Sequence, residues 1–190
     1  EISADGKTLI QPLTSIKGLG EAAIKQILDN RPFAKIEDFI FSDDIVYSKL
    51  NKKALCVLAR SRALDPLMDD RFVNLKHFWS SIAVQRPRKL KNLEENIKVF
   101  HDVEDFTEEE EIEHLINLTG VFPMEMVLDS ETKKRLVELN VPPLSEYDEM
   151  LKLAWFIPRE VLKKKSSKGK NYYLIKAIDS NNEQSVIRCW

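Results

Sequence analysis

The chain has 190 residues, of which 43% are hydrophobic and 32% charged, and its formal net charge at pH 7 is -2; this length holds one domain or two small ones. No apolar run approaches the ~20 residues of a membrane span, so we expect no membrane segment and a cytoplasmic location. Two cysteines without a CxxC pair and three histidines indicate neither a disulfide framework nor a zinc site.

The first part of the chain is predicted to be mainly helical. The chain begins with Glu1 rather than Met, and we expect it to be a piece of a longer protein. Residues 2–11 are mixed in character and predicted to be extended, and helical patterns follow over residues 12–17 and 20–30. Pro32 ends the second pattern because proline cannot continue a helix.

A pair of glycines separates these two helical patterns. Gly18 and Gly20 allow backbone angles that a side chain would forbid, so the chain can reverse within a few residues and leave its amides uncovered. The next helix then begins with unpaired N–H groups and the positive end of its dipole, which suit a phosphate oxygen. Leu19 is expected to point back between the helices, whose inner face carries Leu13, Ile16, Ala23, Ile24, Ile27 and Leu28.

Residues 13–28 resemble a helix-hairpin-helix motif, in which an apolar residue precedes Gly-apolar-Gly and an alanine follows three residues later. The resemblance implies that the hairpin amides bind DNA backbone phosphates without reading the bases. A helical turn with a glycine C-cap is the structural alternative. The residues expected at the DNA contact are Lys17, Gly18, Leu19, Gly20, Glu21, Ala22 and Lys25.

Three further helical segments are predicted before residue 85. They are a short turn over residues 36–41, a helix over residues 52–62 and another over residues 70–84. Ser48 and Asn51 are the candidate caps for the middle segment. Its apolar residues are expected to face a core, and the cations expected to stay exposed are Lys52, Lys53, Arg60 and Arg62.

The order of motifs over residues 7–67 looks like the tandem hairpin region of the alpha subunit of bacterial replicative DNA polymerase III, a C-family polymerase. The glycine hairpin is followed by RPFAKIEDF at residues 31–39, LNKKAL at 50–55 and ALD at 63–65, with Arg62 where the family has glycine. The resemblance implies that double-stranded DNA is held by its phosphates. Further contacts are expected from Asn51, Lys52, Lys53, Arg60 and Arg62.

Charge is strongly segregated along the chain. Residues 101–150 carry three Lys/Arg against fifteen Asp/Glu, whereas residues 46–100 carry twelve against five and residues 151–190 nine against three. Two basic blocks around an acidic one are typical of two nucleic-acid surfaces joined by a linker that avoids the DNA backbone. Ordinary solvated faces would give the same counts.

In the polymerase family a short peptide that binds the sliding clamp lies between the hairpins and the next domain. Residues Asp102–Phe106 occupy the corresponding place, but they lack the glutamine and the apolar fourth residue of that peptide. We favour instead an acidic linker that leads into a helix over residues 108–118, which Thr107 and Glu110 begin with a capping box.

The last forty residues are predicted to form three antiparallel strands, over residues 152–161, 171–178 and 184–190, with a basic turn over residues 163–170. The pattern resembles the beginning of the OB-fold that follows the hairpins in the polymerase family, with three of its five strands. Such folds stack single-stranded bases on aromatic side chains and hold the backbone with cations. The residues expected at a single-stranded DNA template are Lys163, Lys164, Lys165, Lys168, Lys170, Tyr172 and Tyr173, with Trp155 as a further stacking candidate.

The sequence therefore predicts an α+β protein. Its parts are a tandem helix-hairpin-helix domain over residues 1–80, an acidic helical linker region over 81–150 and a partial OB-like unit over 151–190. Neither catalytic nor metal-binding residues are assigned, because adjacent acidic pairs such as Asp43 and Asp44 are better explained as helix caps and solvated charge. By the resemblance, the carboxylates that bind Mg²⁺ lie upstream, in a palm domain.

The function predicted from these patterns is a non-sequence-specific DNA-binding tail of a replicative polymerase, acting in a bacterial nucleoid or an infected bacterial cell. Two other classes remain open. One is the helix-hairpin-helix region of a nuclease or repair protein, and the other is a protein-interaction module without catalytic activity.

Overall fold

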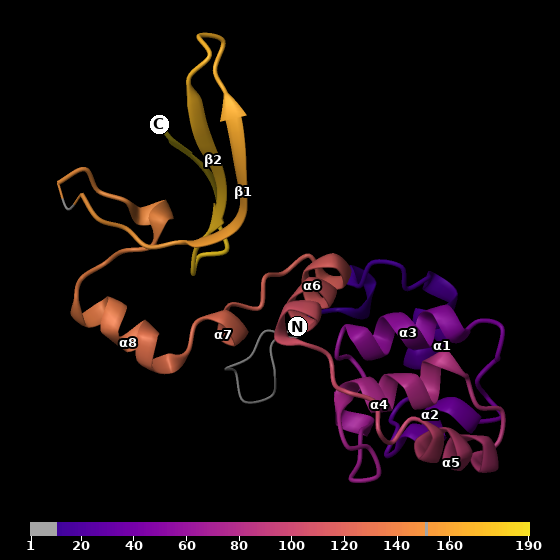
Figure 1. Cartoon of the computed structure of the whole chain (residues 1–190). Coiled ribbons are helices and arrows are strands. Elements are labelled where there is room, and N and C mark those ends of the chain that lie inside the picture. Colours follow the sequence, from indigo (N-terminus) through magenta and orange to yellow (C-terminus); the bar gives the residue numbers. More distant parts are fainter. Residues whose placement is uncertain (1–10, 151) are drawn as a thin grey trace. The chain divides into compact units, whose positions relative to one another are not determined.

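A computed structural model describes residues 11–150 and 152–190 of the chain (Figure 1). The chain forms two compact units, Glu1–Val121 and Phe122–Trp190. The first is helical and the second contains a three-stranded antiparallel sheet, so the predicted α+β class is confirmed. The extended segment predicted over residues 2–11 lies, except for Gln11, outside the described residues. In the part that is described, no helix has both the length and the apolar character needed to cross a membrane.

The helices predicted before residue 85 and over residues 108–118 occur in that order, but the first is much shorter than expected. The helix predicted over residues 70–84 begins only at Leu75, and the helix Leu90–Val99 is not among those predicted. Residues 12–17 contain only a 3-10 turn, η1 (Leu13–Ser15), because Pro12 and Ile16 on its two sides are extended. The elements that follow are α1 (Glu21–Asn30), α2 (Ile36–Phe41), α3 (Lys52–Arg60), η2 (Asp65–Leu67), α4 (Leu75–Trp79), the π-helical η3 (Ser80–Val84), α5 (Leu90–Val99) and α6 (Glu108–Thr119).

The predicted helix caps are confirmed at two places. The Asn51 side chain accepts the Ala54 N–H at 3.0 Å and so begins α3. Thr107 and Glu110 form the reciprocal capping box of α6. Both devices satisfy backbone donors that have no partner at the beginning of a helix.

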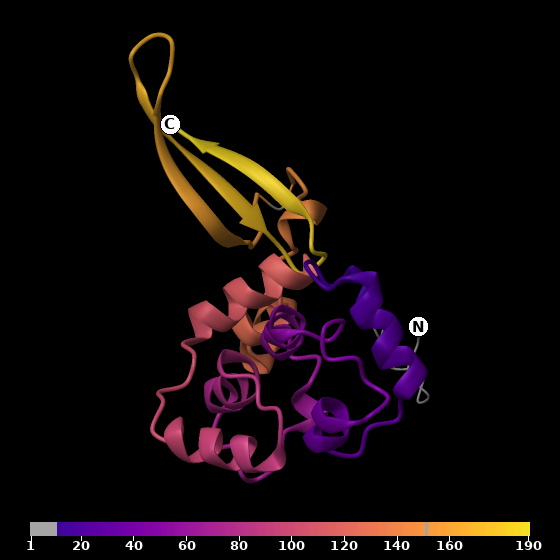
Figure 2. The same cartoon turned by 90° about the vertical axis from the view of Figure 1, so that its right-hand side faces the viewer.

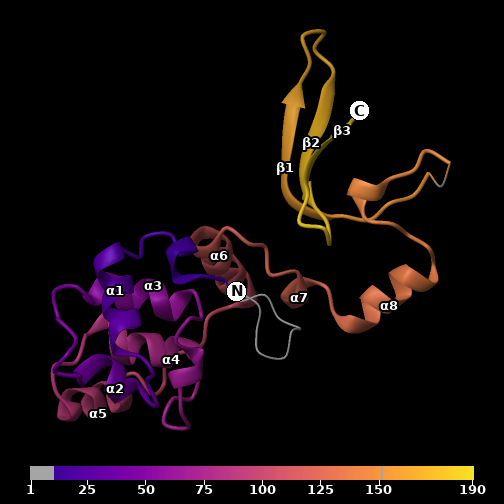
Figure 3. The same cartoon turned by 180° about the vertical axis from the view of Figure 1, so that it is seen from behind.

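The core of the first unit is built around α3. Leu55 and Leu58 of α3 are buried, and this helix packs against α4, η3 and α6. Views from opposite sides place α3 in the middle of the helices of this unit (Figures 1 and 3). Residues spaced three and four apart bury one face of helices such as α1 and α3. The largest buried side chains outside α3 are Phe39, Phe78, Ile36, Leu50, Ile82 and Leu93.

The acidic stretch after α5 belongs to the first unit, whereas the sequence predicts a linker region over residues 81–150. Nδ2 of Asn74 donates to the Val103 carbonyl (2.9 Å), and the Asp105 carboxylate accepts the Lys76 N–H (3.0 Å). These bonds join residues 29 positions apart, and a local pattern of charge contains no signal for them. The unit therefore extends through α6 to residue 121.

The second unit contains α7 (Met124–Val127), α8 (Ser130–Glu138), the 3-10 turn η4 (Leu144–Glu146) and a sheet in the order β1-β2-β3. Figure 2 shows the strands β1 (Ile157–Lys165), β2 (Asn171–Ile178) and β3 (Gln184–Cys189) side by side. The first strand begins and ends later than the predicted 152–161. The turn before β2 is correspondingly shorter, and Gly169 supplies its left-handed residue (φ +78°).

A buried carboxylate joins the sheet to η4. Asp179 is 1% exposed, and its oxygens accept the backbone N–H groups of Ser145 (2.7 Å), Asn181 (2.9 Å) and Glu183 (3.3 Å). Burial alone would raise the pKa of Asp179, but these hydrogen bonds to the charged form outweigh burial and lower it. The ionised side chain therefore fixes this end of the second unit.

Asp179→Asn is expected to loosen that junction, because an amide replaces one acceptor oxygen by a donor while the size is kept. We expect faster hydrogen exchange at the Ser145, Asn181 and Glu183 amides and a loss of about 1–3 kcal/mol in the unfolding free energy of this unit. Because the folded pKa lies below the unfolded value of about 4, the wild-type stabilisation is complete above that pH and is lost as the pH falls through the folded pKa. Unchanged exchange at all three amides would contradict this role.

Candidate nucleic-acid interface

The turn between η1 and α1 depends on one glycine. Gly18 adopts a left-handed conformation (φ +85°), which a residue with a Cβ adopts only with strain. Gly20 is the N-cap of α1 in an extended conformation (φ -76°, ψ 152°), and a Cβ there would meet nothing within 4 Å. The expectation that both glycines need special backbone angles is therefore wrong for Gly20.

Leu19 points into the core, as predicted, and is 8% exposed. The inner face of α1 differs from the prediction at one position, because Leu28 is 45% exposed. Gln26 is buried instead, and its Oε1 accepts the Val46 N–H at 2.6 Å. The buried arc of α1 is centred near Ala23, about 140° around the helix from Leu28.

Several backbone N–H groups at this turn have no acceptor among the described residues, namely those of Gly18, Gly20, Glu21 and Ala22. The last three lie at the beginning of α1, where no carbonyl is available one turn earlier. The first helical bonds run from Ala23 and Ile24 to the Gly20 carbonyl (3.0 and 3.1 Å). The turn therefore presents a cluster of donors at the positive end of a helix dipole.

The segment before Gly18 is held by α6. The Lys17 N–H donates to the Leu118 carbonyl (2.7 Å), and Nε2 of Gln11 donates to the Thr119 carbonyl (3.1 Å). The Lys17 amine lies 3.9 Å from the position that a Cβ would take on Gly120, the C-cap of α6. This cation therefore lies at the negative end of the α6 dipole.

The second turn, after α3, is closed by its own backbone. Arg62 has φ +64°, the left-handed conformation that glycine adopts most easily. Its N–H donates to the Ala59 carbonyl (3.1 Å), and the Ala63 N–H donates to the Leu58 carbonyl (3.0 Å). These are the two bonds of a Schellman motif. The amides at this turn therefore already have acceptors within the protein.

The Arg62 side chain also has partners within the protein. Its Nε lies 2.8 Å from Oδ2 of Asp65, and its Nη1 lies 3.5 Å from Oε2 of Glu111 in α6. The hydrogen bond with Asp65 raises the pKa of Arg62, and the charges of both carboxylates add to the effect. The sequence predicts a DNA contact for this cation, whereas the structure pairs it with two acids.

The other predicted cations of the first unit have different environments. Lys25, Lys52 and Lys53 are exposed, and none has a carboxylate within 4.0 Å in the ranges 11–150 and 152–190. Arg60 is half-buried, and its Nε has no hydrogen-bond partner in those ranges. Asn51 uses its side chain as the cap of α3.

The sheet places the predicted single-strand contacts on two faces. Lys163 is opposite Tyr173, and Lys164 is opposite Tyr172. Successive side chains of a strand point to opposite faces, so these two pairs lie on different sides of the sheet. Tyr172 stacks on Trp190, with ring centroids 4.8 Å apart and an interplanar angle of 28°.

Trp190 is a stacking candidate that the sequence analysis omits, although it is 76% exposed. Alternation along β3 predicts its position: Cys189 is opposite Tyr173, so the next side chain, Trp190, points to the other face, where Tyr172 lies. Trp155 is half-buried and its backbone N–H donates to the Pro142 carbonyl (3.0 Å).

The turn between β1 and β2 carries two further cations predicted at the single strand. Both are exposed: Lys168 and Lys170.

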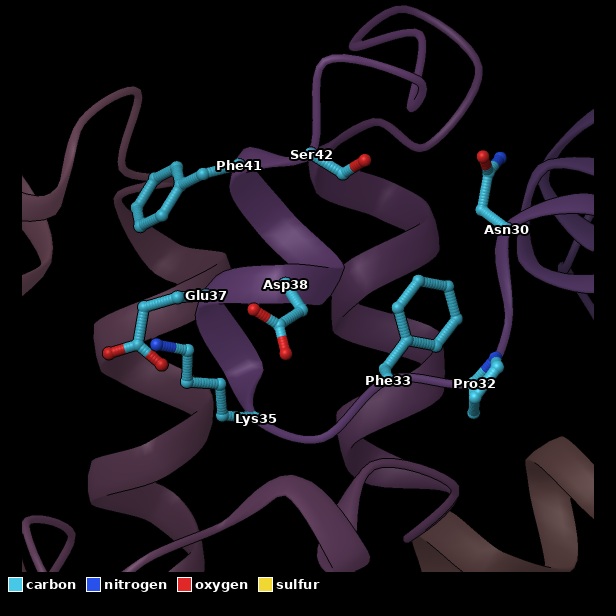
Figure 4. A pocket seen from close by; sticks show the side chains of 8 residues that line it. All are labelled: Asn30, Pro32, Phe33, Lys35, Glu37, Asp38, Phe41 and Ser42. Carbon is cyan, nitrogen blue, oxygen red and sulfur yellow. The ribbon is translucent and has the colours of Figure 1, made fainter.

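A pocket of about 480 Å³ lies beside α2 (Figure 4). Its two acidic side chains already make structural bonds, since Glu37 pairs with Arg71 (2.7 Å) and Asp38 accepts the Ala34 N–H (3.3 Å). The hydrogen bond from Arg71 lowers the pKa of Glu37. Among the residues that the structure describes, no three His, Cys, Asp or Glu side chains are placed to hold a metal ion.

Comparison with known families identifies the first part of the chain. No curated protein and no solved structure matches the sequence. Residues 1–74 match the model of the helix-hairpin-helix motif, a span that contains the Gly18 turn, α1, α2, α3 and the Arg62 turn and ends at Asn74, the N-cap of α4. The resemblance of the sequence to this motif is therefore confirmed, and residues 1–74 carry a helix-hairpin-helix region.

Proposed function

We propose that the first unit binds double-stranded DNA without sequence specificity, by presenting the amides around Gly18 to a backbone phosphate. The observation that carries this proposal is the cluster of N–H groups without acceptors among the described residues, at the beginning of α1 within a helix-hairpin-helix region. Phosphate oxygens accept several donors at once, and the α1 dipole favours their charge. Phosphate contacts fix the position of a protein and carry no direct sequence information.

Side chains near the turn modify this contact. Glu21 is exposed in the first turn of α1 and repels a phosphate, whereas Lys25 is exposed one helical turn later and attracts it. We therefore expect modest affinity, of the order of 10⁻⁴–10⁻⁶ M at physiological salt, with a steep decrease as ionic strength rises.

We propose further that the parent protein is a C-family replicative polymerase whose sheet unit lies near the single-stranded template. The support is that motif positions have structural roles: Phe33 packs edge-on against Phe39 (5.0 Å) and Asn51 caps α3. Arg62, which stands where the family has glycine, takes the left-handed conformation that glycine adopts most easily. Mg²⁺-dependent primer extension by the complete gene product tests this proposal. Nuclease activity of that product would favour the repair alternative.

The sliding-clamp contact has less support than a structural role for the same segment. Within Asp102–Phe106, Val103 and Asp105 accept hydrogen bonds from Asn74 and Lys76 at the beginning of α4, as described above. Phe106 packs against Trp79, with ring centroids 5.6 Å apart. A clamp partner would have to displace these contacts.

Gly18→Val tests the hairpin contact. A β-branched side chain disfavours the left-handed conformation, so we expect the amides to reorient and duplex affinity to fall about tenfold or more, similarly for all sequences. Fluorescence anisotropy with two unrelated duplexes measures both effects. Gly20→Ala is the matched control, because position 20 is extended and has space for a Cβ. A folded Gly18→Val protein with wild-type affinity would remove the hairpin from the proposal.

Two single-charge variants separate unpaired from paired cations. Lys25→Gln is expected to weaken duplex binding and to reduce the steepness of the salt dependence, because its amine is exposed near the turn. Arg62→Gln is expected to leave both nearly unchanged, because its charge is already paired with Asp65 and Glu111. Duplex titrations at several salt concentrations compare the two variants. A larger effect of Arg62→Gln than of Lys25→Gln would contradict the assignment of Lys25, and not Arg62, to the DNA contact.

Replacement of Lys163, Lys164 and Lys165 by alanine tests the sheet. We expect weaker binding of a single-stranded oligonucleotide and a flatter salt dependence, with duplex binding little affected. The control is alanine at Lys133, Lys134 and Arg135, three consecutive cations of α8. A loss confined to duplex binding would show that the single-strand assignment is wrong.

A protein-interaction module remains the alternative class. It predicts no measurable duplex binding at low salt, where phosphate contacts are strongest. That result would replace DNA binding as the function of this region.

A further inference from the structure

Two arginines of the first unit are held on the ring of one tyrosine. Cζ of Arg86 lies 3.7 Å from the centroid of the Tyr47 ring, and Cζ of Arg88 lies 5.4 Å from it. Nη1 of Arg86 also donates to the Tyr47 carbonyl (2.8 Å). Tyr47 is 44% exposed. The stack therefore holds two positive charges together at the surface.

These charges have no anionic partner in the described structure. No carboxylate among those residues lies within 4.0 Å of either guanidinium group, and the buried Nε of Arg86 has no hydrogen-bond partner there. Burial lowers the pKa of Arg86, whereas carboxylate partners raise the pKa of Arg62 and Arg71. An external anion would relieve the repulsion between the two guanidinium groups.

The surrounding sequence adds positive potential. Residues 86–91 read RPRKLK and contain no acidic residue. The first turn of α5, which begins at Leu90, also contains no acidic side chain. Lys89 and Lys91 are exposed, and the one ion pair of Lys91 with another described residue is a long one, to Glu95 (3.9 Å). Anions are therefore expected to concentrate at this surface.

We propose that Tyr47, Arg86 and Arg88 bind a backbone phosphate of double-stranded DNA, as a contact separate from the Gly18 turn. Guanidinium groups bind phosphate through pairs of N–H donors in a planar fork. The exposed Arg88 supplies the free fork, because Nε of Arg86 is buried and its Nη1 donates to the Tyr47 carbonyl. The Tyr47 ring holds the two guanidinium groups before the ligand arrives, which lowers the entropy lost on binding. The inference rests on the proposed function for the source of the phosphate, since free inorganic phosphate has the same chemistry.

Arg88→Gln in the full chain is the principal test, because Arg88 is exposed and no hydrogen bond of its side chain is found in the described residues. We expect duplex affinity to fall several-fold and the slope of log K against log salt to decrease by about 0.9, the contribution of one phosphate contact. Lys98→Gln in the last turn of α5 is the matched control, with the same loss of charge on an exposed side chain. Wild-type affinity and slope in folded Arg88→Gln would overturn the inference.

A local probe separates this inference from the hairpin proposal. The Arg86 Nε–H resonance is followed by NMR during titration with a duplex, in the wild type and in Gly18→Val. A shift in both proteins supports the inference and needs no contribution from the hairpin. If Gly18→Val loses duplex binding while Arg88→Gln retains it, the inference fails and the proposed function stands. If Arg88→Gln loses duplex binding while Gly18→Val retains it, the hairpin contact is excluded and the arginine contact is supported.

Inorganic phosphate and poly-glutamate are the remaining probes. A resonance that responds to inorganic phosphate but not to duplex would show a small-anion site and overturn the inference. A response to poly-glutamate without a response to duplex would identify an acidic protein as the partner and would also overturn the inference. Arg88→Lys gives a further control, because it retains the charge and loses the planar fork.

Discussion

The left-handed backbone at Gly18 is the constraint on which the candidate interface depends. It turns the chain from η1 into α1 within a few residues, buries Leu19 and leaves the following amides without acceptors in the described part of the protein. The preceding amide, of Lys17, is bonded instead to Leu118 of α6. Which donors face solvent is therefore decided by tertiary structure as well as by the glycine pattern.

The two turns of the helix-hairpin-helix region differ because one begins a helix and the other ends one. A helix begins with unpaired donors and ends with unpaired acceptors. The Gly18 turn precedes a helix of ten residues and retains its donors. The Arg62 turn follows α3, and its donors satisfy the last carbonyls of that helix. Arginine takes the left-handed position here at some conformational cost and gains two carboxylate partners.

Signals within a few residues were sufficient for much of the fold. The glycine turn, the Asn51 cap and the Thr107–Glu110 capping box each depend on groups at most four positions apart. Local periodicity also indicates α1, α2, α3, α6 and the three antiparallel strands, whereas α5, α7 and α8 are not among the predicted helices. The first helix was overestimated because apolar spacing around Leu13 does not show that the flanking backbone is extended.

The remaining features depend on contacts between distant segments. The stack of Arg86 on Tyr47 joins residues 39 positions apart, and the Arg62–Glu111 pair joins α6 to the Arg62 turn. Neither contact follows from composition: Tyr47 and Arg86 lie at two ends of the same basic block, and Arg62 and Glu111 lie on opposite sides of a charge boundary. Alternation along the strand predicts that Tyr172 and Tyr173 lie on two faces, but the packing of Tyr172 depends on Trp190.

The bond from Lys17 to Leu118 has a consequence for the order in which the protein forms during synthesis. Its two partners are separated by most of the first unit, so a growing chain that ends before α6 lacks the acceptor for the Lys17 amide. Loop closure over such a length is slow compared with the formation of single helices. The segment before the Gly18 turn therefore gains this bond only after Leu118 has left the ribosome.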